Sequence, residues 1–220
     1  MNLFPLWNSL RIALISSIFI FFFGILIAQL VRKLPRFLKG IIDVILMLPL
    51  VLPPTVCGYL LILIVGPKHP IGMLLSQFGT QLFMDWKGGI LCAFVVAFPL
   101  MYRTVRGAFE AFDENLANAG KTLGLSNTYI FWRIKIPACK NGILSGFVLA
   151  FARALGEYGA TSMLCGYNEY NTATISTTVA NAWNAGRDDV ALFWVLINVV
   201  ISAVVLISVN LIEKSNKGAK

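Results

Sequence analysis

The sequence predicts an all-α integral membrane protein with about five transmembrane helices, forming one domain over residues 1–220. Hydrophobic residues make up 58% of the chain, charged residues only 13%, and the mean hydropathy is +0.78. These values exclude an ordinary soluble globular domain. Several apolar runs also approach the roughly 20 residues that a helix needs to cross a bilayer, and most basic residues lie in every second segment between these runs, which places them on one side of the membrane.

The first predicted span has an apolar stretch from Ile12 to Val31. This stretch is longer than the roughly 7–15 apolar residues of a signal peptide, and no small-x-small cleavage site follows it, so we interpret it as an uncleaved anchor. All five spans are expected near residues 10–31, 41–65, 88–105, 141–163 and 190–212.

The second predicted span contains three prolines, Pro49, Pro53 and Pro54, in the run MLPLVLPPT. Each proline removes a backbone donor and resists a regular helix, which predicts a kink or a break. Irregular backbone at membrane depth needs neighbouring helices or a wet cavity to satisfy its carbonyls, which places this span inside a bundle. A shorter span followed by a loop is the alternative.

The basic residues indicate the orientation. Of the 18 lysines and arginines, 13 lie in the segments 32–39 and 103–140 and in the tail after residue 213. The positive-inside rule then places the amino terminus outside and the carboxyl terminus in the cytoplasm of a multi-pass protein of the cell membrane. This topology accounts for the net charge of +8, so we expect the lipid bilayer, and not nucleic acid, as a partner.

The two predicted outside segments differ in composition. Residues 66–87 contain IGMLLSQFG, which is too short to span and suits a helix lying on the outer surface. Residues 166–189 are rich in Thr, Ser and Asn, which fits either a re-entrant lining or a solvated loop. His69 is the only histidine and the four cysteines form no CxxC pair, so no metal site and no catalytic residues are expected.

The segment 107–140 predicts a compact helix-turn-helix in the cytoplasm. Its first helix, EAFDENLANAGKTLG, should stop at Gly124; Ser126 or Asn127 should then cap a second short helix, which Pro137 should end. The GKT within it lacks the glycine that a phosphate-binding loop needs five positions earlier, because Asn115 stands there. Nucleotide chemistry is therefore expected on a partner.

This loop resembles the cytoplasmic signature of ABC importer permeases, E-A-A, three residues, G, nine residues, then I-x-L-P. The matching positions are Asn118, Ala119, Gly120, Gly124, Ile134, Ile136 and Pro137. The spacing fits, although Asn118 replaces the glutamate, Gly120 the second alanine and Ile136 the leucine. The resemblance implies that the loop docks on an ATPase subunit, and small residues beside a glycine stop would allow close backbone approach. A solvated loop is the alternative.

The stretch AFARALGEYGAT in the fourth predicted span resembles molybdate permeases closely and sulfate permeases somewhat less closely. The resemblance covers about residues 5–212. It implies a homodimeric pore, two cytoplasmic ATPase subunits that use ATP and Mg²⁺, and an extracytoplasmic oxyanion-binding protein. No cofactor is expected in this chain.

A helical projection of Leu144 to Thr161 places small and polar residues on one surface and large apolar ones on the other. Arg153 and Glu157 share the polar surface at i and i+4 near mid-membrane, where an unpaired charge is costly. We therefore predict that Glu157 stays paired, with Arg153 or with the dimer mate. The candidate residues for a gate or a translocation pathway are Arg153, Gly156, Glu157 and Thr161. Mutual neutralisation without a transport role is the alternative.

Together these features predict the permease subunit of an ATP-driven importer for molybdate or a related tetrahedral oxyanion, working by alternating access. A sulfate or tungstate permease is the nearest alternative. A stand-alone secondary transporter or channel is disfavoured because no inverted repeat is evident across five spans. A membrane-embedded enzyme is disfavoured because one histidine and scattered carboxylates offer no catalytic constellation.

Overall fold

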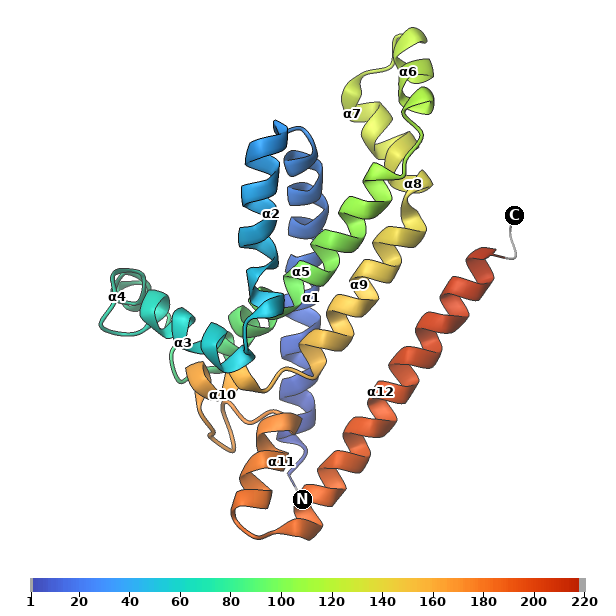
Figure 1. Ribbon diagram of the computed structural model, residues 1–220. Helices are drawn as coiled ribbons and strands as arrows, with labels where there is room; N and C mark the ends of the chain where they lie inside the picture. The colour runs from blue at the N-terminus through green and yellow to red at the C-terminus, as the bar shows by residue number, and fades with distance from the viewer. Residues whose placement is uncertain (1, 218–220) are drawn as a thin grey trace.

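The computed structural model describes the backbone of residues 2–217 and the side chains of residues 2–207, and the described part is helical without strands (Figure 1). A π-helical turn, η1 (Phe131–Lys135), lies between α7 and α8. The α-helices are α1 (Phe4–Arg32), α2 (Arg36–Val51), α3 (Pro54–Val65), α4 (Pro70–Gln77), α5 (Trp86–Glu110), α6 (Glu114–Thr122), α7 (Asn127–Ile130), α8 (Ile136–Ala138), α9 (Lys140–Leu155), α10 (Gly159–Cys165), α11 (Ile175–Asn184) and α12 (Asp188–Lys217).

Three helices are long and apolar enough to cross a membrane: α1, α5 and α12, the last over its described part Asp188–Ile207. They correspond to the first, third and fifth predicted spans. Two further stretches, 36–65 and 127–155, pass the same test only as bent pairs of helices, which gives up to five spans among the described residues. The prediction of five spans is therefore the upper count.

The core forms where α1, α5 and α9 pack together. Small buried residues such as Ala13, Ala93, Ala97 and Ala150 let these helices approach closely, while large side chains such as that of Phe109 fill the remaining space. By contrast, α12 packs against α11 and α9 and otherwise diverges from the bundle (Figure 1). The apolar surface of its described part, Asp188–Ile207, is mostly exposed within the single chain.

The prolines of the second predicted span break it as expected. Helix α2 ends at Val51 and α3 begins at Pro54, and the two axes differ by 115°. Pro54 occupies the first turn of α3, where a missing N–H costs no hydrogen bond. Pro49, in contrast, lies inside α2 without ending it.

The fourth predicted span is not one helix, and the expectation of a continuous helix over 141–163 is wrong. Helix α9 ends at Leu155, and α10 starts only at Gly159. The irregular residues Gly156 to Tyr158 therefore interrupt the span where the projection assumed regular helix.

The two predicted outside segments are partly helical. Residues 70–77 form α4, which exposes Ile71, Met73 and Leu74. The segment 166–189 is not a plain solvated loop, because several of its threonines are buried. It folds onto the start of α1, where the Asn8 side chain donates to the Ala173 carbonyl at 2.9 Å and Ser9 Oγ accepts from the Ile175 N–H at 2.9 Å.

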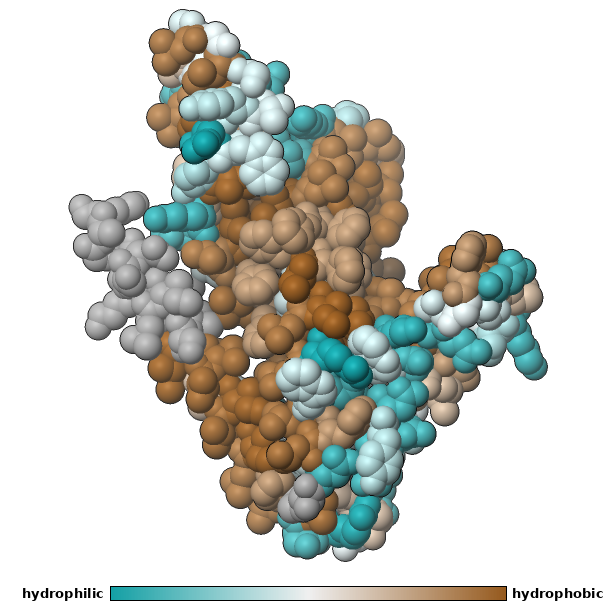
Figure 2. All heavy atoms as spheres, turned by 180° about the vertical axis from the view of Figure 1, so that it is seen from behind, coloured by the Kyte–Doolittle hydropathy of each residue, from teal (hydrophilic) through white to brown (hydrophobic). Residues whose placement is uncertain are grey.

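The polar parts of the molecule lie towards its two ends. Helices α6 and α7 protrude at one end, whereas α10, α11 and the start of α1 lie at the opposite end (Figure 1). Figure 2 shows apolar side chains over much of the middle of one face, with hydrophilic and apolar ones mixed at the protruding end and hydrophilic ones gathered over part of the lower end. This distribution fits a chain whose middle lies in lipid.

Candidate functional site

The candidate site lies where the two helix breaks meet. Helix α3, which starts after the break at Pro53, packs directly against α10, which starts after the break at Gly156. A Cβ on Gly58 would approach backbone atoms of Ala160 to 2.8 Å, and one on Gly159 would approach Pro54 Cβ to 2.8 Å. The two short helices are therefore held together by glycines that permit close contact.

An ion pair occupies the second break. Arg153 Nη1 donates to Glu157 Oε2 at 2.7 Å, and Glu157 Oε1 accepts from the Ala160 N–H at 2.8 Å. The Glu157 side chain is 2% exposed and that of Arg153 is 30% exposed. The predicted pairing of Glu157 with Arg153 is therefore present within one chain. Its geometry differs from the projection because the carboxylate also binds the first turn of α10.

The other two candidate gate residues lie on either side of Glu157. Gly156 is exposed, and nothing crowds the position of its missing side chain, since the nearest atom to a Cβ there would be the Ala152 carbonyl oxygen at 3.8 Å. Thr161 is buried in α10. The structure thus brings Arg153 and Glu157 into contact. Gly156 and Thr161 are close to this pair in the sequence but are not part of it.

A polar cavity of about 160 Å³ lies between the start of α10 and α11. Hydroxyl and amide groups line it, and none of the described residues in its wall is charged: Tyr158, Ser162, Gly166, Tyr167, Thr177, Ala180, Asn181 and Asn184. Neutral donors of this kind can hydrogen-bond an oxyanion. Sequence reasoning did not select these residues, although the abundance of Thr, Ser and Asn in 166–189 was the available signal.

A second feature is the protruding segment α6–η1. The Asp113 side chain accepts from the Asn115 N–H at 2.9 Å at the start of α6, and that of Ser126 accepts from the Tyr129 N–H at 3.2 Å at the start of α7. Gly124 follows α6 with a φ of +78°, a conformation that favours glycine. The predicted stop at Gly124 and the cap at Ser126 are both present.

The expectation that Pro137 ends the second helix is wrong. The chain passes from α7 through η1 into α8 and ends its helical path only after Ala138, with Pro137 in the first turn of α8. The π-helical turn changes the hydrogen-bonding register just before the proline, so that its missing donor does not interrupt the path.

The residues of the predicted coupling signature fall into two groups. Asn118, Ala119, Gly124 and Pro137 are exposed. Gly120 is buried, and a Cβ there would meet Ile130 Cγ1 at 3.1 Å and Ile134 Cδ1 at 3.3 Å, while Ile136 is half-buried. The small residue at position 120 therefore serves packing inside the segment.

Four large apolar side chains are exposed on this segment, and sequence reasoning did not select them: Leu116, Leu123, Tyr129 and Trp132. We call these four the tip surface. An exposed group of large apolar side chains on a protruding element is typical of a contact surface for another protein.

Ion pairs join the helices to one another on the side of the molecule where the α6–η1 segment protrudes. Arg106 of α5 pairs with Asp43 of α2 and with Glu110 at 3.0 Å, and Lys39 also reaches Glu110 at 2.6 Å. Arg32, at the end of α1, pairs with Glu114 of α6, which lowers the pKa of the Glu114 carboxyl. Except for Arg106 with Glu110, which are four residues apart in α5, the partners lie far apart along the chain, so sequence patterns did not reveal these pairs.

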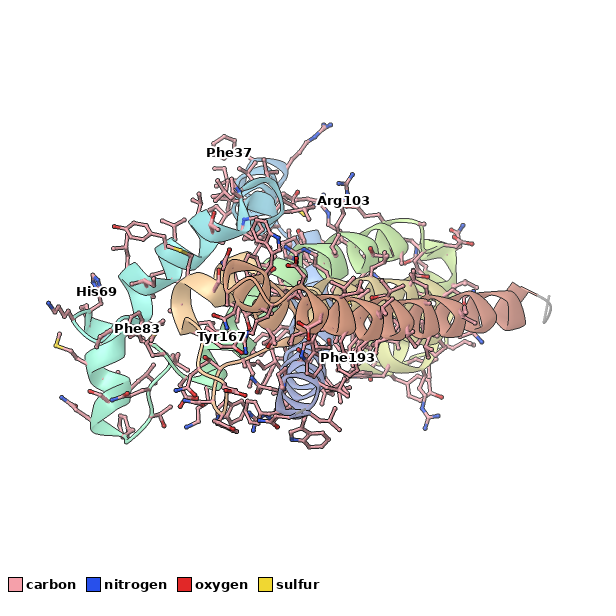
Figure 3. All side chains as sticks on the ribbon, turned by 90° about the horizontal axis from the view of Figure 1, so that it is seen from below. Phe37, His69, Phe83, Arg103, Tyr167 and Phe193 are labelled. Atoms are coloured by element: carbon pink, nitrogen blue, oxygen red, sulfur yellow. The ribbon has the colours of Figure 1, made fainter. Side chains whose placement is uncertain are left out.

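The cysteines and His69 show no sign of a reactive or metal-binding site. All four cysteines are free and buried, and no group of His, Cys, Asp and Glu among the described residues could hold a metal ion. Figure 3 shows His69 at the edge of the molecule, in the turn between α3 and α4 and away from Arg103 and Tyr167.

Comparison with known proteins identifies relatives over most of the chain. Residues 20–217 match the family model described as binding-protein-dependent transport system inner membrane component. The Bacillus subtilis (strain 168) protein YvgM is 34% identical over 203 residues, covering 92% of this chain and 89% of its own. The molybdenum transport system permease protein ModB of Escherichia coli K12 is 43% identical over 162 residues, 71% of either chain.

A more distant relative and one solved structure extend the comparison. The sulfate transport system permease protein CysW of Synechococcus elongatus is 30% identical over 175 residues, covering 80% of this chain and 61% of its own. A bacterial ABC transporter involved in the import of alginate has a similar fold, with a TM-score of 0.76 and 18% identity, over 96% of this chain and 78% of that one.

Proposed function

The chain belongs to the family of inner membrane components of binding-protein-dependent transport systems, and from this premise we propose that it is the permease subunit of an ABC importer for molybdate. It is a multi-pass membrane protein and a transport subunit, not an enzyme. The observation that carries the choice of substrate is the 43% identity to a molybdenum permease, against 30% to a sulfate permease.

The substrate class we propose is the tetrahedral oxyanion dianion, with molybdate first and tungstate or sulfate as alternatives. The neutral hydroxyl and amide groups of the cavity between α10 and α11 support an anion route, because they offer donors without a repelling carboxylate. The only carboxylate of the second break, Glu157, is already neutralised by Arg153. An unpaired carboxylate would repel a dianion by several kcal/mol in a medium of low effective dielectric.

The partners follow from the family. We place the amino terminus outside and the tip surface in the cytoplasm, with the tip surface and the exposed residues Asn118 and Ala119 against a separate ATPase subunit. Two copies of this chain would form the pathway, with two ATPase subunits and an extracytoplasmic binding protein that delivers the anion. ATP and Mg²⁺ would act in the ATPase subunits. The largely exposed apolar surfaces of α2 and α12 within the single chain support a second copy as a partner.

Alternating access in this arrangement would use the two broken spans. The break at Pro53 separates α2 from α3, and the break at Gly156 separates α9 from α10, so the two segments on either side of each break could tilt separately. Movement of the α6–η1 segment would reach α1 through the ion pair of Arg32 with Glu114, and α9 through α8. ATP binding would shift the bundle only to the extent that the ATPase binds one of the two conformations more tightly.

The test is uptake into proteoliposomes that contain this chain, its ATPase and its binding protein. We expect ATP-dependent uptake of radiolabelled molybdate that tungstate competes for well and sulfate competes for weakly. Stronger competition by sulfate than by tungstate would assign the chain to sulfate import. Uptake by this chain without the ATPase would instead indicate a secondary transporter or channel and would refute the proposed coupling.

A further inference from the structure

A basic cavity lies at the end of α1, outside the candidate pathway. Its volume is about 510 Å³, and its wall comes from the last turns of α1 together with α6, α7 and η1. Four basic residues line it, Arg32, Lys33, Lys121 and Lys135, against a single carboxylate, that of Glu114. Because Glu114 is paired with Arg32, the cavity keeps a clear excess of positive charge.

Lys135 is the buried member of this group. It is 4% exposed, and its ammonium lies 4.6 Å and 5.5 Å from the ring centres of Phe109 and Phe112. Among the described residues the Lys135 ammonium makes one hydrogen bond, to Gln29 Oε1 at 3.3 Å, and takes part in no ion pair. An ammonium has three donors, so this buried group keeps the capacity to bind an anion.

The electrostatic environment of Lys135 agrees with a shortage of negative charge. Burial, reinforced by the nearby Arg32 guanidinium, lowers the pKa of the Lys135 ammonium to about 8. In addition, Arg32 Nε is buried and has no hydrogen-bond partner among the described residues. An anion in the cavity would supply the negative charge that the Lys135 ammonium lacks.

The same cavity has an apolar wall that a free inorganic anion would not use. Leu26, Leu30 and Trp132 are 53%, 51% and 57% exposed, and all three line the cavity. Leu26 and Leu30 lie on a membrane-spanning helix, about two turns and less than one turn before Arg32 and Lys33. An apolar strip that leads into a basic pocket matches an amphipathic ligand with an acyl chain and a charged head.

We propose that this cavity binds the phosphate headgroup of an anionic phospholipid, with Lys33, Lys121 and Lys135 around the phosphate and the acyl chain along Leu26 and Leu30. Basic pockets between transmembrane helices at the cytoplasmic surface are typical headgroup sites. A lipid held there joins the end of α1 to the α6–η1 segment. The proposal rests on the proposed cytoplasmic placement of the α6–η1 segment but not on which anion the importer carries, so a negative result for molybdate uptake leaves it standing.

The experiment is native mass spectrometry of the purified full chain with added phosphatidylglycerol or phosphatidylcholine. We expect retention of phosphatidylglycerol only. The double variant Lys33→Gln/Lys121→Gln removes two exposed lysines and should weaken retention about 30-fold, at roughly fivefold for each lysine. The matched control, Lys68→Gln/Lys87→Gln, makes the same charge change away from the cavity and should bind as the wild type does.

Further arms separate lipid from free phosphate and from misfolding. Lys135→Met should also lose the lipid, and if this variant fails to fold, the double variant of exposed lysines decides. Equal retention of both lipids, or equal loss in the double variant and the control, would overturn the proposal. So would a thermal stabilisation of the wild type by inorganic phosphate without retention of phosphatidylglycerol, because the ligand would then be a free anion.

Discussion

The contact between α3 and α10 can be tested by adding one methyl group at Gly58. A Cβ there would lie 2.8 Å from the Ala160 Cα, the Ala160 carbonyl oxygen and Met163 Cβ. Because two of these atoms belong to the backbone, the helices themselves must separate by about 0.6 Å to restore ordinary contact. Overpacking of this kind costs about 1–3 kcal/mol, and backbone contacts favour the upper end of that range.

Part of this cost is offset by helix propensity. Replacing glycine by alanine inside a helix contributes about 1 kcal/mol of stabilisation, so Gly58→Ala should lower the free energy of unfolding by about 2 kcal/mol in total. For a chain of this size that corresponds to a fall of about 4–8 °C in the unfolding midpoint. Gly40→Ala is the matched control, because no atom lies within 4 Å of a Cβ at that position in α2. It should raise the midpoint by about 2–4 °C.

A thiol-reactive fluorescent dye suits this measurement, because all four cysteines are free and buried and become reactive only on unfolding. Both variants should be compared in the same detergent at the same protein concentration. If Gly58→Ala were as stable as Gly40→Ala, the close packing of the two broken spans would not exist as described.

Four further predictions concern charged and exposed groups. Glu157→Gln keeps an acceptor for the Ala160 N–H but leaves Arg153 without its charged partner. We expect the free energy of unfolding to fall by about 1–3 kcal/mol and the uptake rate to fall at least tenfold, with the exposed Glu169→Gln as control. Unchanged uptake would show that the pair has no functional role. Leu123 on the tip surface is 79% exposed, so Leu123→Asp should change the free energy of unfolding by no more than about 0.5 kcal/mol, while co-purification of the ATPase is lost. Phe78 is 78% exposed at another site, and Phe78→Asp should leave co-purification intact. Asp43→Asn removes the ion pair with Arg106 that joins α2 to α5. The free energy of unfolding should fall by only about 1 kcal/mol, because water screens both partners in part. A dye-monitored unfolding midpoint equal to that of the exposed control Asp188→Asn would contradict this. Burial lowers the pKa of Lys135 to about 8 in the folded chain, against an ordinary value of 10.5. Between about pH 8 and pH 10.5 the Lys135 amine therefore carries a proton in the unfolded chain but not in the folded chain. The wild type in lipid-free detergent should gain stability as the pH rises through that window. Lys135→Met should lack this gain when thermal unfolding is followed by circular dichroism. If the unfolding midpoint changed equally with pH in both proteins, Lys135 would not be the group that titrates.

Local features of the sequence predicted the parts of the fold that depend on neighbouring residues. Hydropathy located α1, α5 and α12, because a span requires only a long apolar run. The paired prolines predicted the break before α3, and Gly124 and Ser126 predicted the turn between α6 and α7. Each of these signals acts through one residue's own backbone or side chain.

The fourth span shows where such reasoning stops. Periodicity predicted regular helix through Gly156, whereas Glu157 turns its carboxylate to the Ala160 N–H and starts a new helix. The projection still found the contact of Arg153 with Glu157, because the two residues remain within one turn of each other. It missed Tyr158 and Ser162 as cavity residues, because their neighbours come from α11.

By itself, the sequence determined a helical membrane protein with the three spans α1, α5 and α12, one proline break and the resemblance to oxyanion permeases. Apolar run length, backbone chemistry and motif spacing are properties of the chain alone. Only the tertiary structure decided that the two broken spans meet at Gly58 and Gly159, and that residues 166–184 fold onto Asn8 and Ser9. It also decided that Lys135 is buried beside Gln29 and takes part in none of the ion pairs among the described residues. These features arise between residues about 100 or more positions apart, where the energy of packing and of satisfying buried polar groups depends on the whole bundle.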